Sequence, residues 1–183
     1  MKKIKFYGIG GQGAVTAAKI FSEAVSLYQN EYAITVPAYG HERRGAPVYA
    51  HIIVDENPVL LNCYVYEPDV ILVMDDTLID KDVDVGEGCT EKTVLVLNSG
   101  SKEMIQRYKD TYGFKRVYAC DGTTVAKNIL NMNIPNSAML GALAKTGIVT
   151  IEAMERAIQD GFGKVGEKNV NAARDAYERT YEA

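Results

Sequence analysis

A glycine-rich stretch near the N-terminus constrains the fold most strongly. The segment Lys3 to Tyr7 leads directly into Gly8-Ile9-Gly10-Gly11-Gln12-Gly13, and a series of periodically spaced apolar residues follows. This order predicts a β-strand, a tight turn and a helix that begins at once. We expect Gly8 to let the strand turn sharply, Gly10 to let a ligand approach the bare backbone, and Gly13 to let the helix pack on the strand.

The same spacing is the dinucleotide-binding fingerprint G-x-G-x-x-G, in the strand-to-helix context that this fingerprint requires. The free N–H groups of the first helical turn and the positive end of the helix dipole would form a site for an anion such as a phosphate. NAD binding also requires a carboxylate at the end of the second strand. That strand, predicted over 31–36, ends in Pro37-Ala38-Tyr39, while Glu31 stands at its start, so NAD is disfavoured. An alternative is that the glycines only close a tight turn.

The loop over 37–47 is the most unusual segment of the chain. It contains Tyr39 and the adjacent pair Arg43 and Arg44, and it has no apolar periodicity. Loops that leave the carboxyl ends of neighbouring strands share one edge of a doubly wound sheet, so we expect this loop beside the glycine turn. Guanidinium groups suit phosphate or carboxylate, and Tyr39 could stack on a flat ring. The alternative is that an arginine anchors the loop by pairing with Glu42 or a backbone carbonyl.

The rest of the chain alternates between strand and helix patterns. Strands are predicted at 48–54, 59–64, 70–74, 93–97 and 116–119. Helices are predicted at 14–28, 102–112 and 122–130, and only helices follow Pro135. We expect 48–54 and 59–64 to pair as a hairpin across a turn. The pattern predicts an α/β fold, namely an open, mostly parallel, doubly wound sheet with a β-hairpin insertion and C-terminal helices.

Polar residues follow two of the predicted buried strands. Asp75 and Asp76 come directly after 70–74, and Asn98 comes directly after 93–97. Paired carboxylates can bind a metal or act as acid and base, but the sequence offers no third ligand at a helpful spacing. We therefore expect the two aspartates to cap the next short helix and treat Asn98 as a candidate polar group at the edge of the sheet.

Composition excludes several classes of function. A formal charge of −4 argues against general binding to nucleic acid or to an acidic membrane, which requires an electropositive face. No apolar run approaches the roughly 18 residues of a membrane span, and we expect a cytoplasmic location. The 183 residues, 47% of them hydrophobic, most simply form one domain.

Cysteine and histidine usage limits the chemistry that this chain could perform alone. Cys63, Cys89 and Cys120 lie far apart and form no C-x-x-C pair, so we assign this chain no iron–sulfur cluster or zinc site and expect buried or half-buried thiols. No Ser/His/Asp or Cys/His constellation is evident, and we assign no catalytic residue. The chain reads as one part of a larger assembly.

Three segments resemble the gamma subunit of the 2-oxoacid:ferredoxin oxidoreductases. They are Gly8 to Gly13, Tyr39-Gly40-His41-Glu42-Arg43-Arg44-Gly45-Ala46-Pro47, and Asn136-Ser137-Ala138-Met139-Leu140-Gly141. The resemblance covers nearly the whole chain, and residues 1–183 are expected to form one gamma-type catalytic domain. The resemblance implies that the chain is a subunit of an enzyme complex and is inactive without the other subunits.

That family decarboxylates a 2-oxoacid on thiamine diphosphate, passes electrons through iron–sulfur clusters to ferredoxin and transfers the acyl group to coenzyme A. The resemblance implies that thiamine diphosphate and the clusters lie mainly on alpha, beta and delta-type partner subunits, and that the gamma component assists coenzyme A binding and assembly. The 2-oxoacid itself, whether pyruvate, 2-oxoglutarate, a branched-chain or an aryl one, is not defined by this chain.

On this basis we expect the backbone of the glycine turn and the two arginines to bind the phosphates of coenzyme A, with Tyr39 or Asn98 fixing its orientation. The candidate cofactor-binding residues are Gly8, Gly10, Gly11, Gln12, Gly13, Tyr39, Arg43, Arg44 and Asn98. Two alternatives are a nucleotide-binding Rossmann-like oxidoreductase that works alone and a purely structural subunit whose arginines pair with a neighbour.

Overall fold

The computed structural model describes residues 1–38, 45–60, 62–81 and 83–183. The strands are β1 (Lys2–Ile9), β2 (Tyr32–Ala38), β3 (Pro47–Asp55), β4 (Val70–Val73), β5 (Val94–Asn98), β6 (Arg116–Cys120) and β7 (Tyr181–Glu182). The α-helices are α1 (Ala14–Tyr28), α2 (Lys102–Tyr112), α3 (Gly122–Leu130), α4 (Asn136–Ala144), α5 (Ile151–Phe162) and α6 (Gly166–Arg179). Two short 3-10 helices are η1 (Asp76–Asp80) and η2 (Gly163–Val165).

The strands form one open sheet in the order β2-β3-β1-β4-β5-β6-β7. The central strands β1, β4, β5 and β6 are parallel, whereas β3 runs antiparallel to both β1 and β2, and β7 runs antiparallel to β6. The predicted α/β class, with a parallel sheet at its centre and helices at the C-terminal end of the chain, is confirmed.

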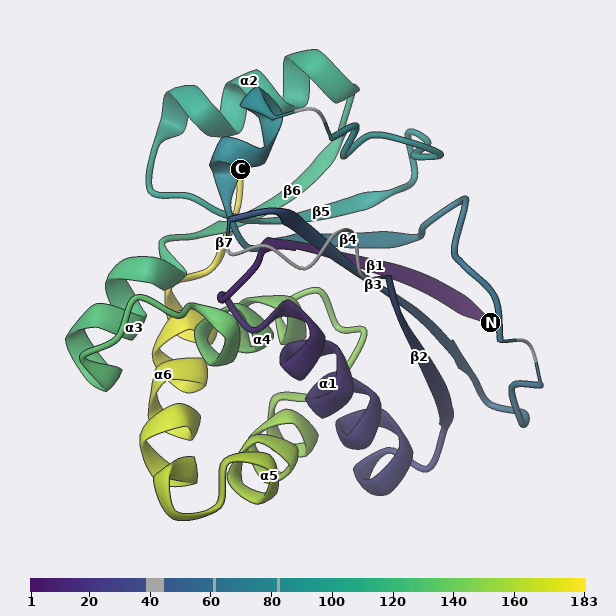
Figure 1. Cartoon of the computed structure of the whole chain (residues 1–183), viewed down its shortest axis with the longest axis vertical. Helices are drawn as coiled ribbons and strands as arrows, with labels where there is room; N and C mark the ends of the chain where they lie inside the picture. The colour runs from purple at the N-terminus through teal and green to yellow at the C-terminus, as the bar shows by residue number, and fades with distance from the viewer. Residues whose placement is uncertain (39–44, 61, 82) are drawn as a thin grey trace.

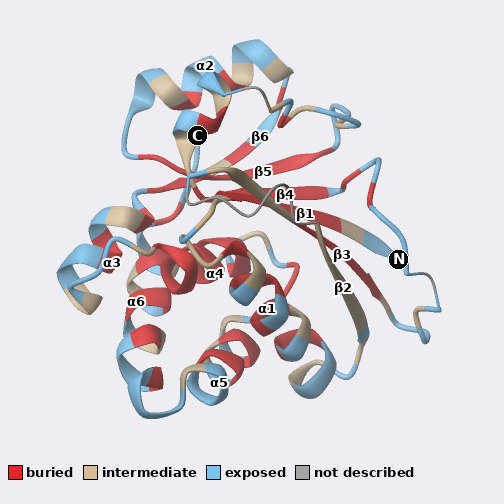
Figure 2. Ribbon diagram, in the orientation of Figure 1, coloured by how far each residue is buried: buried red, intermediate tan, exposed pale blue. Residues whose placement is uncertain are grey.

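Helices cover both faces of the sheet, so the molecule has three layers (Figure 1). One face carries α1 and α3 to α6, and the other carries α2 and η1. Figure 2 shows that the central strands and α4 are almost entirely buried. Alternate residues of β1 enter the two cores, Phe6 on the side of α1 and Tyr7 on the side of α2.

Side chains cap the starts of α2, α3 and α5. Ser101 Oγ accepts from Met104 N at 3.2 Å, and Thr150 Oγ1 accepts from Ala153 N at 3.2 Å. Asp121 caps α3 through its bond from Thr124 N. These side chains bind amides that the first helical turn leaves without partners, and α1, α2 and α3 span the predicted ranges.

The hairpin has a different partner from the one predicted. β3 pairs with β1 on one edge and with β2 on the other, so neither edge is free for 59–64. The described residues of that segment form no strand. The predicted pairing was wrong because a strand has only two edges, and both are occupied by segments that precede it in the chain.

Two further features were missed or misjudged. Tyr181, expected on the last helix, lies instead in the short strand β7, beside β6. Cys63 is exposed, contrary to expectation, while Cys89 is partly buried and Cys120 is buried. Burial raises the pKa of the Cys89 and Cys120 thiols to about 11, which keeps them protonated near neutral pH. None of the helices within the described ranges combines the length and apolar character of a membrane span.

Candidate functional site

The glycine turn lies at the carboxyl end of β1. The strand continues through Gly8 to Ile9, so the chain turns two residues later than predicted. Gly11 and Gly13 have φ angles of +100° and +77°, which side chains rarely tolerate. The sharp turn therefore depends on these two glycines and not on Gly8.

The packing of α1 on β1, predicted to depend on Gly13, depends on a different glycine. A Cβ on Gly8 would lie 3.0 Å from Ala14 Cβ, so Gly8 is the residue that lets α1 pack against β1. A Cβ on Gly13 would lie 2.6 Å from Asn136 Nδ2 at the start of α4. Gly13 thus permits contact with a second helix, and the contact with the strand predicted for it belongs to Gly8.

Gln12 braces the turn with its side chain. Its Oε1 accepts from Ile9 N at 2.9 Å, and its Nε2 donates to Asp75 Oδ2 at 2.6 Å. Asp75 Oδ1 in turn accepts from Thr77 N at 3.0 Å and caps η1, as the sequence predicts. The amide of Gln12 therefore links the ends of β1 and β4. A direct contact between this side chain and a ligand stays a prediction.

The N-terminus of α1 has Gly13 as its N-cap, and no side chain of the described residues caps it. The same holds for α4 and α6, whereas α2, α3 and α5 each have a side-chain cap. Gly13 O already accepts from Ala17 N at 2.8 Å. The amides of the first turn and the positive end of the helix dipole are the groups that bind phosphates in proteins.

The ends of the arginine loop lie beside this turn. Pro47, the first residue of β3, pairs with Ile9, and Gly10 N donates to Ala46 O at 2.8 Å. β2, which precedes the loop, ends at the same edge of the sheet because β3 runs antiparallel to both β1 and β2. Tyr39, Arg43 and Arg44 lie outside the described residues, so their predicted role stays a prediction.

The third segment of the family resemblance reaches the same place. Asn136 begins α4, is 7% exposed, and points its amide nitrogen at Gly13. Its Oδ1 accepts from Ser137 N at 2.8 Å. Three segments separated widely in sequence, the glycine turn, the flanks of the arginine loop and the start of α4, thus meet at the carboxyl end of β1.

Carboxylates occupy the neighbouring part of the edge. A polar hollow of about 280 Å³ lies beyond β4 and β5, and its lining includes Asp75, Asp76 and Asp121. Ser99 Oγ donates to Asp76 Oδ2 at 2.6 Å, and Thr124 Oγ1 donates to Asp121 Oδ2 at 2.7 Å. Negative charge here disfavours phosphate, so an anion would approach the glycine turn from the side of β1 and β3.

Asn98 lies on this acidic side. Its Nδ2 donates to Met74 O at 2.8 Å and to Thr123 Oγ1 at 2.9 Å, and its Oδ1 accepts from Thr123 N at 3.2 Å. It is 7% exposed. The side chain ties β4, β5 and the start of α3 together, and its predicted contact with coenzyme A remains untested.

Sequence reasoning missed a group of polar and aromatic side chains on the sheet face under 64–66. Lys5 and Tyr7 of β1, with Tyr49 and His51 of β3, line a cavity together. The signal was present, because residues two apart in a strand point to the same face. The predicted hairpin concealed it, since it paired β3 with the wrong segment.

Fold and site define an α/β protein with a glycine turn between a strand and a helix at the carboxyl end of its parallel strands. Residues 3–179 match the model of the pyruvate ferredoxin/flavodoxin oxidoreductase family. The chain therefore belongs to this family, as a gamma-type subunit of a 2-oxoacid:ferredoxin oxidoreductase, and it is a component of an enzyme complex.

Individual relatives agree with this assignment over nearly their full length. The chain is 45% identical over 184 residues to the common gamma subunit of the pyruvate/ketoisovalerate oxidoreductases of Pyrococcus furiosus, covering 98% of this chain and 97% of the relative. It is 43% identical over 179 residues to the pyruvate synthase subunit PorC of Methanocaldococcus jannaschii, covering 97% and 96%. The crystal structure of the pyruvate oxidoreductase subunit PORC of Thermotoga maritima matches with a TM-score of 0.85 at 33% identity, covering 100% and 98%.

Proposed function

We propose that this subunit binds the phosphates of coenzyme A for its complex, at the glycine turn through the amides of Gly11 and Gly13, and on the side chains of Arg43 and Arg44. Gly10 N and Gln12 N already donate to Ala46 O and Ile9 O. The observation that supports this most is that the arginine loop ends against the glycine turn, where Gly10 N donates to Ala46 O at 2.8 Å. Coenzyme A carries a diphosphate and a 3′-phosphate, so it needs several positive donors, and helix amides with arginine forks supply them.

The partners in this proposal are alpha, beta and delta-type subunits, which hold thiamine diphosphate and the iron–sulfur clusters, with ferredoxin as the electron acceptor of the complex. Residues 1–183 act as one gamma-type domain in it. Tyr39 is the side chain we expect to orient the ligand, since Asn98 lies on the acidic side and its amide already makes three hydrogen bonds.

Titration of coenzyme A into the assembled complex tests the arginines. We expect the Arg43→Ala/Arg44→Ala complex to bind coenzyme A at least about tenfold more weakly, because two charge-assisted hydrogen-bonding groups are lost. Isothermal calorimetry at low salt measures the change. Equal affinity in both complexes would remove the arginines from the site.

A pair of glycine variants tests the turn. Gly11 and Gly113 both have positive φ and open space where a Cβ would be, but Gly113 follows α2, far along the chain from the turn. Both changes to alanine should cost similar stability, about 1 kcal/mol. Only Gly11→Ala should weaken coenzyme A binding, because only Gly11 belongs to the turn whose amides are proposed to bind the phosphates. Equal affinities in the two variants would contradict the role of the turn.

A further inference from the structure

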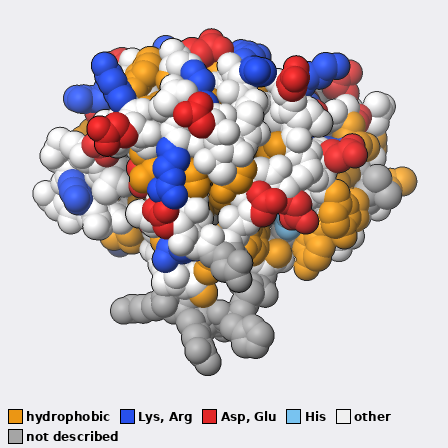
Figure 3. Space-filling view, turned by 90° about the horizontal axis from the view of Figure 1, so that it is seen from above, with side chains coloured by type: hydrophobic (Ala, Val, Ile, Leu, Met, Phe, Trp, Pro, Cys, Tyr) orange, Lys and Arg blue, Asp and Glu red, His pale blue; other side chains and the backbone are white. Residues whose placement is uncertain are grey.

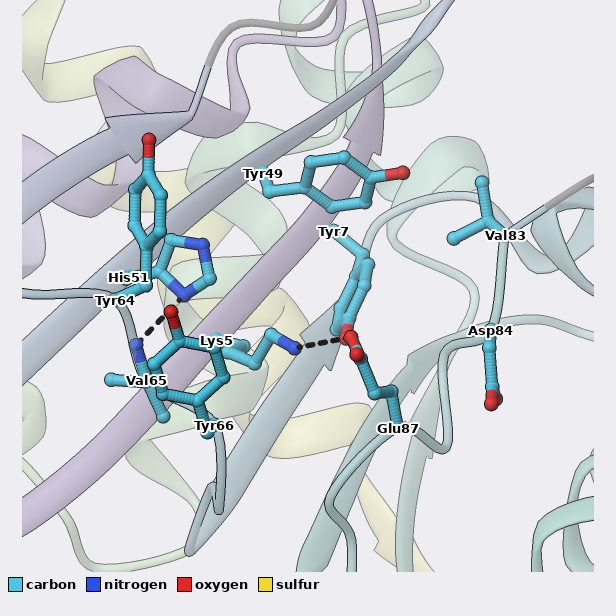
Figure 4. A pocket seen from close by; sticks show the side chains of 10 residues that line it. All are labelled: Lys5, Tyr7, Tyr49, His51, Tyr64, Val65, Tyr66, Val83, Asp84 and Glu87. Atoms are coloured by element: carbon cyan, nitrogen blue, oxygen red, sulfur yellow. Dashed lines mark hydrogen bonds and ion pairs between the residues drawn. The ribbon is translucent and has the colours of Figure 1, made fainter.

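A cavity of about 290 Å³ opens on the sheet face that carries α2, away from the first turn of α1. β1 and β3 form its floor, and the irregular segments around 64–66 and 83–87 form its walls (Figure 4). In Figure 3, hydrophobic side chains gather at the surface beside acidic side chains and a histidine. This histidine is His51, since the other histidine of the chain lies outside the described residues.

One buried hydrogen-bond donor at the floor lacks an acceptor among the described residues, and a buried lysine lies beside it. Tyr7 is 2% exposed, and its hydroxyl has no partner among the described residues. Lys5 is 4% exposed, and its Nζ forms an ion pair with Glu87 Oε2 at 3.6 Å and lies 5.3 Å from the centre of the Tyr7 ring. Leaving a hydroxyl such as that of Tyr7 unpaired in the interior is costly, and native proteins rarely do so without a ligand or water.

Aromatic rings surround these donors. The Tyr7 and Tyr49 rings meet edge to face with centroids 5.4 Å apart, and the His51 and Tyr64 rings lie 4.7 Å apart. Tyr66, 70% exposed, projects at the mouth. Flat rings of this kind favour a flat, polarizable ligand that can stack against them.

The acidic residues of the wall restrict the ligand further. Asp84 and Glu87 line the cavity, so with Lys5 its formal charge is −1. A simple carboxylate would be repelled, whereas a neutral ring with both acceptors and a donor would satisfy both kinds of group. An aminopurine has this pattern, since its ring nitrogens accept and its exocyclic amino group donates.

We propose that this cavity binds the adenine ring of a nucleotide-type cofactor, with Tyr7 and Lys5 donating to ring nitrogens and Glu87 accepting from the amino group. Glu87 has the freedom to do so, because its side chain is 70% exposed. Naming the cofactor as coenzyme A rests on the proposed function. The spacing fits, because Tyr7 precedes Gly10 by three residues, roughly 10 Å along an extended strand.

The two walls are held together by a close backbone contact. A Cβ on Gly88 would overlap the carbonyl oxygen of Tyr66, so the segment after Glu87 packs directly on the segment that carries Tyr66. The cavity is therefore formed by the folded chain before any ligand arrives, as small-molecule sites usually are.

The test uses calorimetry on the assembled complex with three probes: adenosine, coenzyme A and 4′-phosphopantetheine, which lacks the adenine. We expect Tyr66→Ala and Tyr7→Phe to weaken adenosine and coenzyme A binding, by about tenfold for the lost stacking and about threefold to tenfold for the lost hydroxyl. Affinity for phosphopantetheine should not change. Tyr32→Ala, at an exposed tyrosine of β2, is the matched control.

Thermal unfolding separates binding from folding, since Tyr7→Phe removes a hydroxyl without a partner and should leave the melting temperature equal or higher. Adenosine and coenzyme A affinities that match wild type in both variants would overturn the adenine assignment. A further outcome is that adenosine binding falls in both tyrosine variants while the Arg43→Ala/Arg44→Ala complex binds coenzyme A with wild-type affinity. That result would support the adenine cavity and contradict the proposed phosphate site.

Discussion

At the scale of the residue, the position of His51 in β3 determines the protonation state of its side chain. It is 8% exposed, and its Nδ1 accepts from Val65 N at 3.2 Å, which requires the neutral ring. Burial lowers the pKa of His51, and the nearby Lys5 ammonium lowers it further. The imidazole is thus held neutral on the face of β3, where it packs against Tyr64.

This lowered pKa predicts a pH dependence of stability. The unfolded chain takes up the histidine proton near pH 6.5, above the folded value, so stability is complete above about pH 6.5 and declines as pH falls toward the folded pKa. We expect the urea concentration at the midpoint of unfolding to decrease as the pH is lowered from about 7.5 to about 5.5. This decrease should be smaller in His51→Gln.

His41→Gln is the control, because the chain has only two histidines. It should keep the wild-type pH dependence if His51 carries the effect. Identical pH profiles for wild type and His51→Gln would show that burial of His51 does not contribute.

At the scale of the element, sequence patterns were most successful where the signals were local. Ser101, Asp121 and Thr150 cap the starts of α2, α3 and α5, and such caps are local because they involve residues only three apart. The hairpin partner of β3 was wrong because strand pairing joins distant segments, and two apolar runs were available.

Helix packing gives an element-scale prediction. A Cβ on Gly141 of α4 would overlap the carbonyl of Ala173 in α6, which is backbone and cannot rotate away. We expect Gly141→Ala to lower the free energy of unfolding by about 1–3 kcal/mol, measured in urea.

Gly161→Ala in α5 is the matched control, because the new methyl group would meet only side-chain atoms of Ile20, at 3.1 Å and 3.3 Å. Its effect should lie within about 0.5 kcal/mol, since a small shift of that side chain is offset by the better helix propensity of alanine. A loss of the same size in both variants would argue against a close α4–α6 contact as the cause.

At the scale of the whole molecule, both proposed sites lie along β1. The glycine turn follows Ile9, and the tyrosine cavity begins at Tyr7 and Lys5 on the opposite face from α1. One bound molecule would therefore run from the glycine turn, past the carboxyl end of β1, to the cavity on the sheet face that carries α2. The carboxylates of the acidic hollow beyond β4 and β5 disfavour the approach of a phosphate from that side.

As a component of a larger enzyme, the chain should lack activity alone. We expect the purified chain to reduce no ferredoxin with any 2-oxoacid, and activity to appear when alpha, beta and delta-type subunits are added, because the redox centres in our proposal lie on them. Ferredoxin reduction measured spectroscopically is the readout. Turnover by the isolated chain would contradict the division of functions between subunits.

The sequence by itself determined the α/β class, the ranges of α1 to α3, a glycine turn between β1 and α1, and the family, because these depend on local periodicity, capping and glycine spacing. Only the tertiary structure decided which strand pairs with β3, that Asn136 reaches Gly13, and that Gln12 and Asn98 serve as braces. It also assembled the cavity of Tyr7 and His51. Such contacts join residues far apart in the chain, and no local pattern encodes which distant segments will meet.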